Sequence, residues 1–442
     1  MAFSTKILIH LYSLCTTGVA TLFRLTRLVW PNQIQRKISP RLSLSQSACT
    51  LSSGSKPVLF FASSAGEFEQ ARPVMNVLLE KGIESVVVFF SESGIEFAQK
   101  TGEKAPYFLY PIDTLHHAKK VLEHVDPRAA VVIRHELWPS FLFMTKKKKV
   151  PLFLANGSIT SDETSFFKKF LKSSLYRLFD RIFVCRASDI EKFNRMYGCR
   201  PDQLLLTGDT KYDRVIERTQ QKSSEINNGK IEKKTKEDKN TTHPYLPFNS
   251  VSTPTLIIGS AWQEDLTIIL KAASEFIHER KLNLVVAPHK IDQSSIKTMQ
   301  RILLSFSLKS RLISKEVTLP LETDSSIRVL ILDTMGQLGD FYKLCDFAVV
   351  GGAFHHQVHN VLEPAANGLS IAFGPLYKNS HEAEALVKQN LAVSVSSHVE
   401  LKEWIKDFLE KTAEEKNSDT TKLVDYVESL TGASEQIARH LS

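Results

Sequence analysis

The sequence predicts an α/β protein with two doubly wound, parallel-sheet domains behind an apolar N-terminal helix. Its 442 residues exceed what a single ordinary core fills, so two domains are expected. Two stretches of the chain alternate short apolar runs with segments of helical periodicity, which is typical of βαβ units. A polar segment without hydrophobic periodicity separates them. We therefore expect domains at 31–216 and 254–442, joined by a flexible linker or insertion at 217–253.

The N-terminal segment is apolar over residues 7–23, which reaches the lower limit for a membrane span. Lys6 precedes it and several arginines and lysines follow it, so the positive-inside rule leaves the later domains in the cytoplasm. A cleaved signal peptide is the alternative, because Gly18-Val19-Ala20 resembles a weak cleavage site. The downstream arginines and five scattered cysteines favour a membrane-anchor helix at 1–30.

Ten apolar runs predict the strands of the two sheets, at 57–62, 85–90, 129–133, 151–155, 181–184, 255–258, 282–287, 328–332, 347–350 and 370–373. Helical patterns such as 68–79 and 115–124 lie between them. Ligands of open parallel sheets bind where strands end and helices begin. The residues that follow these runs, on the two sides of a cleft between the domains, are therefore the candidate site.

The formal net charge of +8 suits an anionic partner such as a phosphorylated substrate or an anionic lipid. A nucleic-acid partner is not expected, because the sequence lacks a basic stripe with interleaved aromatic residues. Residues 166–183 alternate apolar and basic side chains at helical spacing, as in a helix on an anionic membrane. An apolar face packed on the core is the alternative, and we favour it, with the lysines near lipid phosphates.

Glu67 falls in the first turn of the helix expected after strand 57–62. The helix dipole favours an ionised carboxylate at this place, and that carboxylate could accept a proton. A glutamate in a first turn equally well caps the helix. These physical arguments leave the two interpretations open.

A second candidate segment follows strand 347–350. Gly351 and Gly352 allow a tight turn, and a helix beginning near Asn360 would present N–H groups to a phosphate. Glu363 could accept hydrogen bonds from ribose hydroxyls. No cysteine or carboxylate cluster completes a metal site, so contacts to sugar or phosphate are expected from His355, His356 and His359.

The loops at 259–262 and 333–337 are expected on the same face as these two segments, since each links a strand to a helix. The sequence has no G-x-G-x-x-G fingerprint and no P-loop lysine motif, so dinucleotide and ATP binding lose support. We expect neither a metal nor another cofactor.

Six blocks of the sequence, in order, resemble the lipid A Kdo (3-deoxy-D-manno-octulosonic acid) transferases. They are Ala-Ser-Ser-Ala-Gly-Glu at 62–67, Glu-Leu-Trp-Pro at 136–139, Gly-Asp-Thr-Lys-Tyr-Asp at 208–213, Asp-Thr-Met-Gly-Gln-Leu at 333–338, Asn-Val-Leu-Glu-Pro at 360–364 and Phe-Gly-Pro at 373–375. The resemblance implies a GT-B fold, CMP-Kdo as donor, lipid IVA as acceptor and inversion at the anomeric carbon. It also implies lipopolysaccharide core biosynthesis at the cytoplasmic side of the cell inner membrane.

The resemblance also implies roles for individual residues. Glu67 matches the general base, and Lys211 matches a residue that stabilises the transition state. The stretches that match the CMP-binding segments contain Pro288, His289, Met335, Gly336, Gln337, Asn360, Val361, Leu362 and Glu363.

Several positions depart from the family pattern and imply a divergent member. Arg134 stands where family members often have a glutamate linked to catalysis, and a cation there could stabilise a departing phosphate. Ser158 and His289 each stand where an arginine is typical, and Gln357-Val358 replaces Gly-Gly. Two alternatives remain: another GT-B enzyme, such as a different lipid glycosyltransferase or a UDP-sugar 2-epimerase, and a catalytically silent membrane-bound scaffold.

Overall fold

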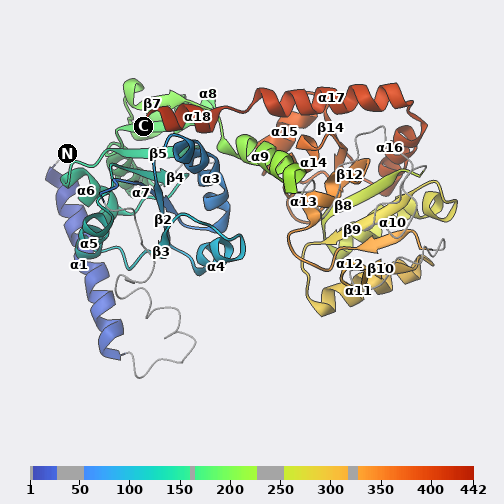
Figure 1. The fold of residues 1–442 in the computed structure, drawn as a ribbon, viewed down its shortest axis with the longest axis horizontal. Helices are drawn as coiled ribbons and strands as arrows, with labels where there is room; N and C mark the ends of the chain where they lie inside the picture. Colours follow the sequence, from blue (N-terminus) through green and yellow to red (C-terminus); the bar gives the residue numbers. More distant parts are fainter. Residues whose placement is uncertain (1–2, 27–53, 160–164, 226–252, 317–326) are drawn as a thin grey trace. The chain divides into compact units, whose positions relative to one another are not determined.

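The computed structural model describes residues 3–26, 54–159, 165–225, 253–316 and 327–442 (Figure 1). The chain forms two compact units, Met1–Arg214 with Leu430–Ser442 and Val215–Ser429. Each unit holds a seven-stranded parallel sheet. The expected pair of doubly wound α/β domains is therefore confirmed. The boundaries differ from the expected ones, because the last residues of the chain return to the first unit.

The first unit has its sheet in the order β3-β2-β1-β4-β5-β6-β7. Its strands are β1 (Val58–Ala62), β2 (Ser85–Phe89), β3 (Tyr107–Leu109), β4 (Ala129–Ile133), β5 (Leu152–Gly157), β6 (Arg181–Val184) and β7 (Leu204–Leu206). Its helices are α1 (Phe3–Thr26), α3 (Ala65–Glu80), α4 (Glu92–Lys100), α5 (Leu115–Val125), α6 (Pro139–Lys147), α7 (Phe166–Tyr176), α8 (Ala187–Tyr197), η3 (Pro201–Gln203), the start of α9 (Thr210–Glu225) and α18 (Ala433–Arg439). Phe61 packs on one face of the sheet and Phe60 on the other, so both faces are covered and the central strands read as continuous apolar runs.

The second unit has its sheet in the order β10-β11-β9-β8-β12-β13-β14. Its strands are β8 (Thr255–Ala261), β9 (Asn283–Pro288), β10 (Ser310–Leu312), β11 (Val329–Ile331), β12 (Phe347–Val350), β13 (Ser370–Phe373) and β14 (Ala392–Ser394). Its helices, besides the rest of α9, are α10 (Gln263–His278), α11 (Gln293–Ser305), α12 (Ile313–Glu316), α13 (Leu338–Tyr342), α14 (Leu362–Ala366), α15 (His381–Lys388), α16 (His398–Glu410) and α17 (Ala413–Ser429).

All ten predicted strands are confirmed, and the four unpredicted ones share one property. β3, β7, β10 and β14 are the edge strands of the two sheets, and each is three residues long. An edge strand is covered less than a central one and needs no long apolar run. The apolar run of an edge strand in the sequence is therefore too short to be predicted as a strand.

The predicted linker at 217–253 begins as helix. α9 continues through Glu225, so the residues from 217 to 225 carry regular structure rather than an irregular linker. Residues 226–252 lie outside the described residues.

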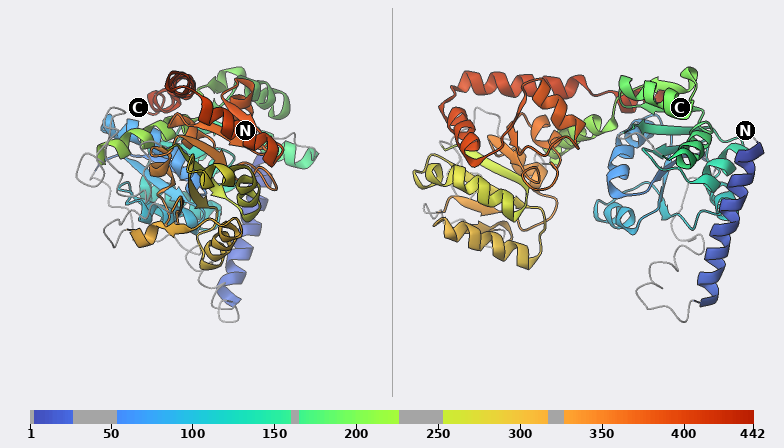
Figure 2. Two further views of the ribbon diagram at one scale, coloured as in Figure 1. Left: turned by 90° about the vertical axis from the view of Figure 1, so that its right-hand side faces the viewer. Right: turned by 180° about the vertical axis from the view of Figure 1, so that it is seen from behind.

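Helix α1, the dark blue helix in Figure 2, runs along the first unit and packs against α6. Ile9 and Ala20 are buried, and the Ser13 hydroxyl accepts a hydrogen bond from the backbone N–H of Leu115 at 2.9 Å. Its segment Lys6–Phe23 is long and apolar enough to cross a membrane. Apolar side chains are exposed on the rest of its surface, namely Ile7, Leu11, Leu14, Val19, Leu22 and Leu25.

Helix α7 presents apolar side chains to solvent. Leu175 and Tyr176 near its end are buried, whereas Phe166, Phe167 and Phe170 are exposed. The favoured prediction that the whole apolar face packs on the core is therefore wrong for these three phenylalanines. They lie in the first turns of the helix, beyond the part that Leu175 and Tyr176 fix to the core.

Candidate active site

Glu67 sits at the start of α3, directly after the buried strand β1. Its Oε2 accepts hydrogen bonds from the backbone N–H groups of Ser63 at 2.6 Å and Ser64 at 3.0 Å. In return the backbone N–H of Glu67 donates to Oγ of Ser64. This is a capping box, so the helix-capping interpretation of Glu67 describes its geometry correctly. The carboxylate is thereby fixed in one orientation.

The pKa of Glu67 is raised above that of an ordinary glutamate. Burial is the main cause, and the negative charge of Glu136 adds to it. The two backbone hydrogen bonds and the positive charge of Arg134 act in the opposite direction. The result is a carboxylate that binds a proton more readily than usual, which a general base requires.

Arg134 follows β4 and has a left-handed backbone, with φ of 62°. Its Nε donates to Oε1 of Gln70 at 2.6 Å, and its Nη2 lies 3.4 Å from Oδ2 of Asp209. The structure therefore brings this predicted site residue to α3, the helix that carries Glu67. Since its guanidinium is engaged on both sides, Arg134 also positions its two partners.

A buried polar network continues from Gln70. Asn156 at the end of β5 donates to Oε1 of Gln70 at 3.1 Å and to Oγ1 of Thr210 at 2.7 Å. The Thr210 hydroxyl donates to the backbone carbonyl of Gln70 at 2.7 Å. Thr210 begins α9, and the next residue is the predicted Lys211. The network therefore holds the backbone that carries Lys211 relative to α3.

Sequence reasoning missed Gln70 and Asn156. The available signal for Gln70 was its spacing, because it lies three residues after Glu67 and so falls on the same side of α3. Asn156 has a left-handed backbone, with φ of 57°, and is fully buried. No sequence pattern predicts this combination. Its role in the network depends on β5 and the start of α9 lying next to each other, which the sequence does not show.

Two buried polar atoms of the first unit have no hydrogen-bond partner among the described residues and follow central strands of its sheet. They are Oγ of Ser63 and Nε1 of Trp138. Ser63 follows β1 and Trp138 follows β4, the neighbouring strand. The Trp138 ring packs on Phe90 with ring centroids 4.0 Å apart. Buried donors of this kind are usually satisfied, so both suit a ligand with hydroxyl groups.

In the second unit, four ring side chains meet where β8, β9 and β12 end. His289 stacks on Trp262 and on His359, with ring centroids 4.3 Å and 4.6 Å apart. Nε1 of Trp262 donates to Nε2 of His359 at 3.0 Å. His356 packs against Trp262 at 4.4 Å. Among these, Trp262 lies in the predicted loop 259–262, but its contact with the histidines was not predicted.

Asp265 fixes the loops on which these rings stand. Its Oδ2 accepts from the backbone N–H of Gly352 at 2.7 Å and of Trp262 at 3.0 Å. A Cβ on Gly351 would lie 2.5 Å from the carbonyl oxygen of Ser260. Glycine is therefore required at 351 for packing between the protein's own loops, in addition to the tight turn that the sequence predicted.

The segment that begins at Asn360 leads into the short helix α14. Oδ1 of Asn360 accepts from the backbone N–H of Leu362 at 3.0 Å, so that N–H is already satisfied. Val361 and Leu362 are buried, which leaves their backbone rather than their side chains for a ligand. Oε1 of Glu363 accepts from Nη1 of Arg218 at 2.7 Å. The predicted ribose contact of Glu363 would have to share the carboxylate with this arginine.

The remaining predicted residues lie on adjacent strands of the same sheet. Pro288 is the buried last residue of β9, so His289 begins the loop that follows. Met335 and Gly336 follow β11, and Met335 is 71% exposed. Gln337 precedes α13 and accepts a hydrogen bond from the Thr334 hydroxyl. Met335 thus offers an exposed apolar side chain beside a fixed turn.

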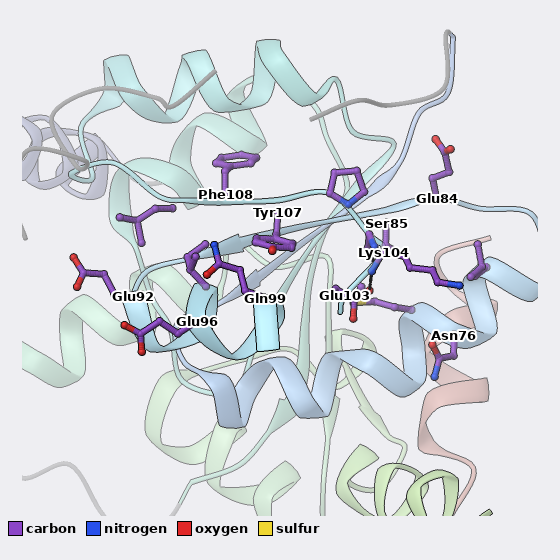
Figure 3. Close-up of a pocket in the computed structure, with 16 residues that line it drawn as sticks. Asn76, Glu84, Ser85, Glu92, Glu96, Gln99, Glu103, Lys104, Tyr107 and Phe108 are labelled. Carbon is purple, nitrogen blue, oxygen red and sulfur yellow. Dashed lines mark hydrogen bonds between the residues drawn. The ribbon is translucent and has the colours of Figure 1, made fainter. Parts of the chain in front are cut away.

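A cavity of about 930 Å³ lies in the first unit between α3, α4 and the edge strand β3 (Figure 3). Carboxylates, including those of Glu92, Glu96 and Glu103, are prominent in its lining. None of the predicted site residues lines it. We therefore place the candidate chemistry at the strand ends described above and not in this cavity.

The sequence is similar to a family of sugar transferases. A model of the family described as 3-deoxy-D-manno-octulosonic-acid transferase (kdotransferase) matches residues 35–214. The 3-deoxy-D-manno-octulosonic acid transferase of Chlamydia muridarum is 27% identical over 367 residues, 81% of this chain and 79% of that protein. The enzymes of the same name from Aquifex aeolicus and Haemophilus influenzae are 25% and 23% identical, over 76% and 72% of this chain and 82% and 70% of theirs.

Solved structures share the fold. UDP-GlcNAc 2-epimerase from Neisseria meningitidis, bound to UDP-GlcNAc, superposes with a TM-score of 0.61 at 13% identity, covering 87% of this chain and 99% of that one. A glycosyltransferase from Rickettsia africae superposes with a TM-score of 0.53 at 10% identity, covering 88% and 99%. These likenesses identify the fold as GT-B.

Proposed function

We propose that this chain, which is similar to the 3-deoxy-D-manno-octulosonic acid (Kdo) transferases over most of its length, is a divergent glycosyltransferase of that family and acts in lipopolysaccharide biosynthesis. It transfers Kdo from CMP-Kdo to lipid IVA with inversion at the anomeric carbon. The observation that carries the proposal is Glu67, a fixed carboxylate with a raised pKa at the start of α3, shortly after β1.

In the proposed reaction, Glu67 takes the proton from a hydroxyl group of the acceptor sugar. The hydroxyl oxygen attacks the anomeric carbon of Kdo from the face opposite CMP, and the bond between that carbon and the phosphate oxygen breaks. CMP leaves with the bonding electrons, so no general acid is needed. A carboxylate with a raised pKa suits this step, because proton transfer is most effective when the pKa of the base approaches the working pH.

Negative charge develops on the phosphate of CMP as it leaves, and cations stabilise such a transition state. We assign this role to Lys211, whose backbone N–H donates to Oδ1 of Asp209 at 2.9 Å. Arg134 contributes through its contact with the same aspartate. It thereby supports the backbone of the Lys211 segment as well as the charge balance around Glu67.

The CMP group is proposed to bind at the strand ends of the second unit. Pro288, His289 and the turn 335–337 lie at the ends of the adjacent strands β9 and β11. The segment 360–363 would offer its backbone and the carboxylate of Glu363. In the first unit, Nε1 of Trp138 and Oγ of Ser63 are suited to hydroxyl groups of the acceptor.

Helix α1 is proposed to attach the protein to the cytoplasmic face of the cell inner membrane. Its exposed apolar side chains and those of Phe166, Phe167 and Phe170 support a lipid-facing surface. Lysines within α7 would meet anionic lipid headgroups, namely Lys168, Lys169 and Lys172.

The test is a transfer assay with purified protein, CMP-Kdo and lipid IVA. The wild type should release CMP and give a heavier lipid by mass spectrometry, which also counts the Kdo residues added. Absence of CMP release together with turnover of a UDP-sugar would contradict the donor assignment. Release that persists at the wild-type rate in Glu67→Gln would contradict the base assignment.

A further inference from the structure

The histidine–tryptophan stack of the second unit, made of Trp262, His289, His356 and His359, has a composition suited to an anion. It stands at the carboxyl ends of β8, β9 and β12, which are adjacent in the sheet, where ligands of parallel sheets bind. Nζ of Lys290 lies 5.6 Å from the centroid of the Trp262 ring and adds a positive charge. Cationic and potentially cationic groups therefore converge on one indole ring.

The hydrogen bond between Trp262 and His359 determines which imidazole ring can take up a proton. Indole Nε1 is only a donor, so Nε2 of His359 must accept, and the proton of neutral His359 is on Nδ1. Protonation of Nε2 would break this bond and release Trp262. His289 instead stacks by its face on both rings and is exposed, so its nitrogens can reach a ligand.

The charged and titratable groups that face His289 are Lys290, His356, His359 and Asp265. Partial burial lowers the pKa of His289 and of His359, and the neighbouring Lys290 and His356 lower that of His289 further. Asp265 acts in the opposite direction, but its Oδ2 already accepts two backbone hydrogen bonds. An anion at the edge of the His289 ring would therefore supply negative charge that favours its protonated form.

We propose that the histidine–tryptophan stack binds the phosphate of the nucleotide donor and that His289 takes up a proton as the phosphate binds. The protonated imidazole would be stabilised by the phosphate on its edge and by the Trp262 ring on its face. This inference rests on the proposed function, because it assigns the donor phosphate of that same reaction. It makes donor affinity dependent on pH, which a permanently charged arginine at this position would not.

The test uses cytidine 5′-(methyl phosphate). This phosphodiester keeps one charge throughout the pH range, whereas CMP itself ionises near pH 6. Calorimetric titrations from pH 5.5 to 8, in two buffers with different ionisation enthalpies, measure affinity and proton uptake together. The wild type should take up a proton, and its affinity should fall with rising pH by up to about tenfold per unit.

Three variants complete the experiment. His289→Gln should bind more weakly at pH 5.5 and lose the pH dependence, while His289→Arg should bind tightly with a flat profile. His398→Gln, an exposed histidine at the start of α16, should behave as the wild type. A wild type that binds the ester without proton uptake, or a His289→Gln variant with the wild-type slope, overturns the inference and leaves the proposed donor intact. A wild type that does not bind the ester at any pH overturns the proposed donor, and this inference with it.

Discussion

The guanidinium of Arg134 donates from Nε to Oε1 of Gln70, 2.6 Å away. This bond connects the residue after β4 to α3, the helix that carries Glu67. It also explains how an arginine fits where the family pattern has a glutamate, because Gln70 and Asp209 receive its hydrogen bonds. The positive charge of Arg134 in turn limits the rise in the pKa of Glu67.

Replacing Glu67 by Gln should reduce Kdo transfer by at least about 100-fold, the usual contribution of a general base. The amide oxygen of Gln can still accept from Ser63 and Ser64, so the capping of α3 should be retained. The control is Glu400→Gln, because the Glu400 carboxylate also accepts a backbone N–H hydrogen bond at the start of a helix, from Ser396 before α16. Activity is read from CMP release and stability from urea unfolding. Equal loss of activity in both variants would mean that capping, and not proton transfer, explains Glu67.

The maximal rate at saturating donor should decrease as the pH is lowered, and the midpoint of this decrease should lie above the pKa of an ordinary glutamate. Only the ionised form of Glu67 accepts a proton, and burial raises its pKa. As the pH falls through that raised pKa, the fraction of ionised Glu67 decreases and the rate falls with it. A rate profile from pH 4 to 8 measures this limb. An acid limb near the ordinary value of about 4.3 would contradict the assignment.

Arg134 has a left-handed backbone, so Arg134→Gly and Arg134→Ala should differ. Both remove the guanidinium. Alanine would adopt the positive φ at a steric cost, whereas glycine adopts it without one. We expect the glycine variant to be more stable in urea unfolding by about 1 kcal/mol. Both variants should shift the acid limb to higher pH, because the charge that lowers the pKa of Glu67 is gone. An unshifted limb in both would show that Arg134 does not act on Glu67.

Substituting Leu11 and Leu14 of α1 by lysine should release the protein from membranes. Both side chains are exposed, at 53% and 69%, so the fold of the first unit should tolerate the change. Flotation with vesicles containing anionic lipid measures the bound fraction. The matched control is the same double substitution at Leu304 of α11 and Val399 of α16, which are also exposed. Retained membrane binding in the α1 variant would locate the lipid contact elsewhere.

The part of the site that lies in short motifs at strand ends could be predicted from the sequence. Glu67 at a strand-to-helix junction and the glycines after β12 could be recognised from their spacing. Gln70 and Asn156 could not, because their role depends on α3, β5 and α9 meeting. The contact between Trp262 and His289 joins residues that follow two different strands, and no pattern within either segment shows it.

The two parallel sheets follow from the sequence alone, because continuous apolar runs between helical patterns are typical of parallel strands that helices cover on both faces. The sequence also determined where ligand-binding residues would be found, because parallel strands direct their following loops to one edge. Two features are visible only in the folded chain: its last residues return to the first unit, and Arg134 is held between Gln70 and Asp209. These features depend on contacts between residues far apart in the chain. The packing of the core brings such residues together, so no local sequence pattern shows the contacts.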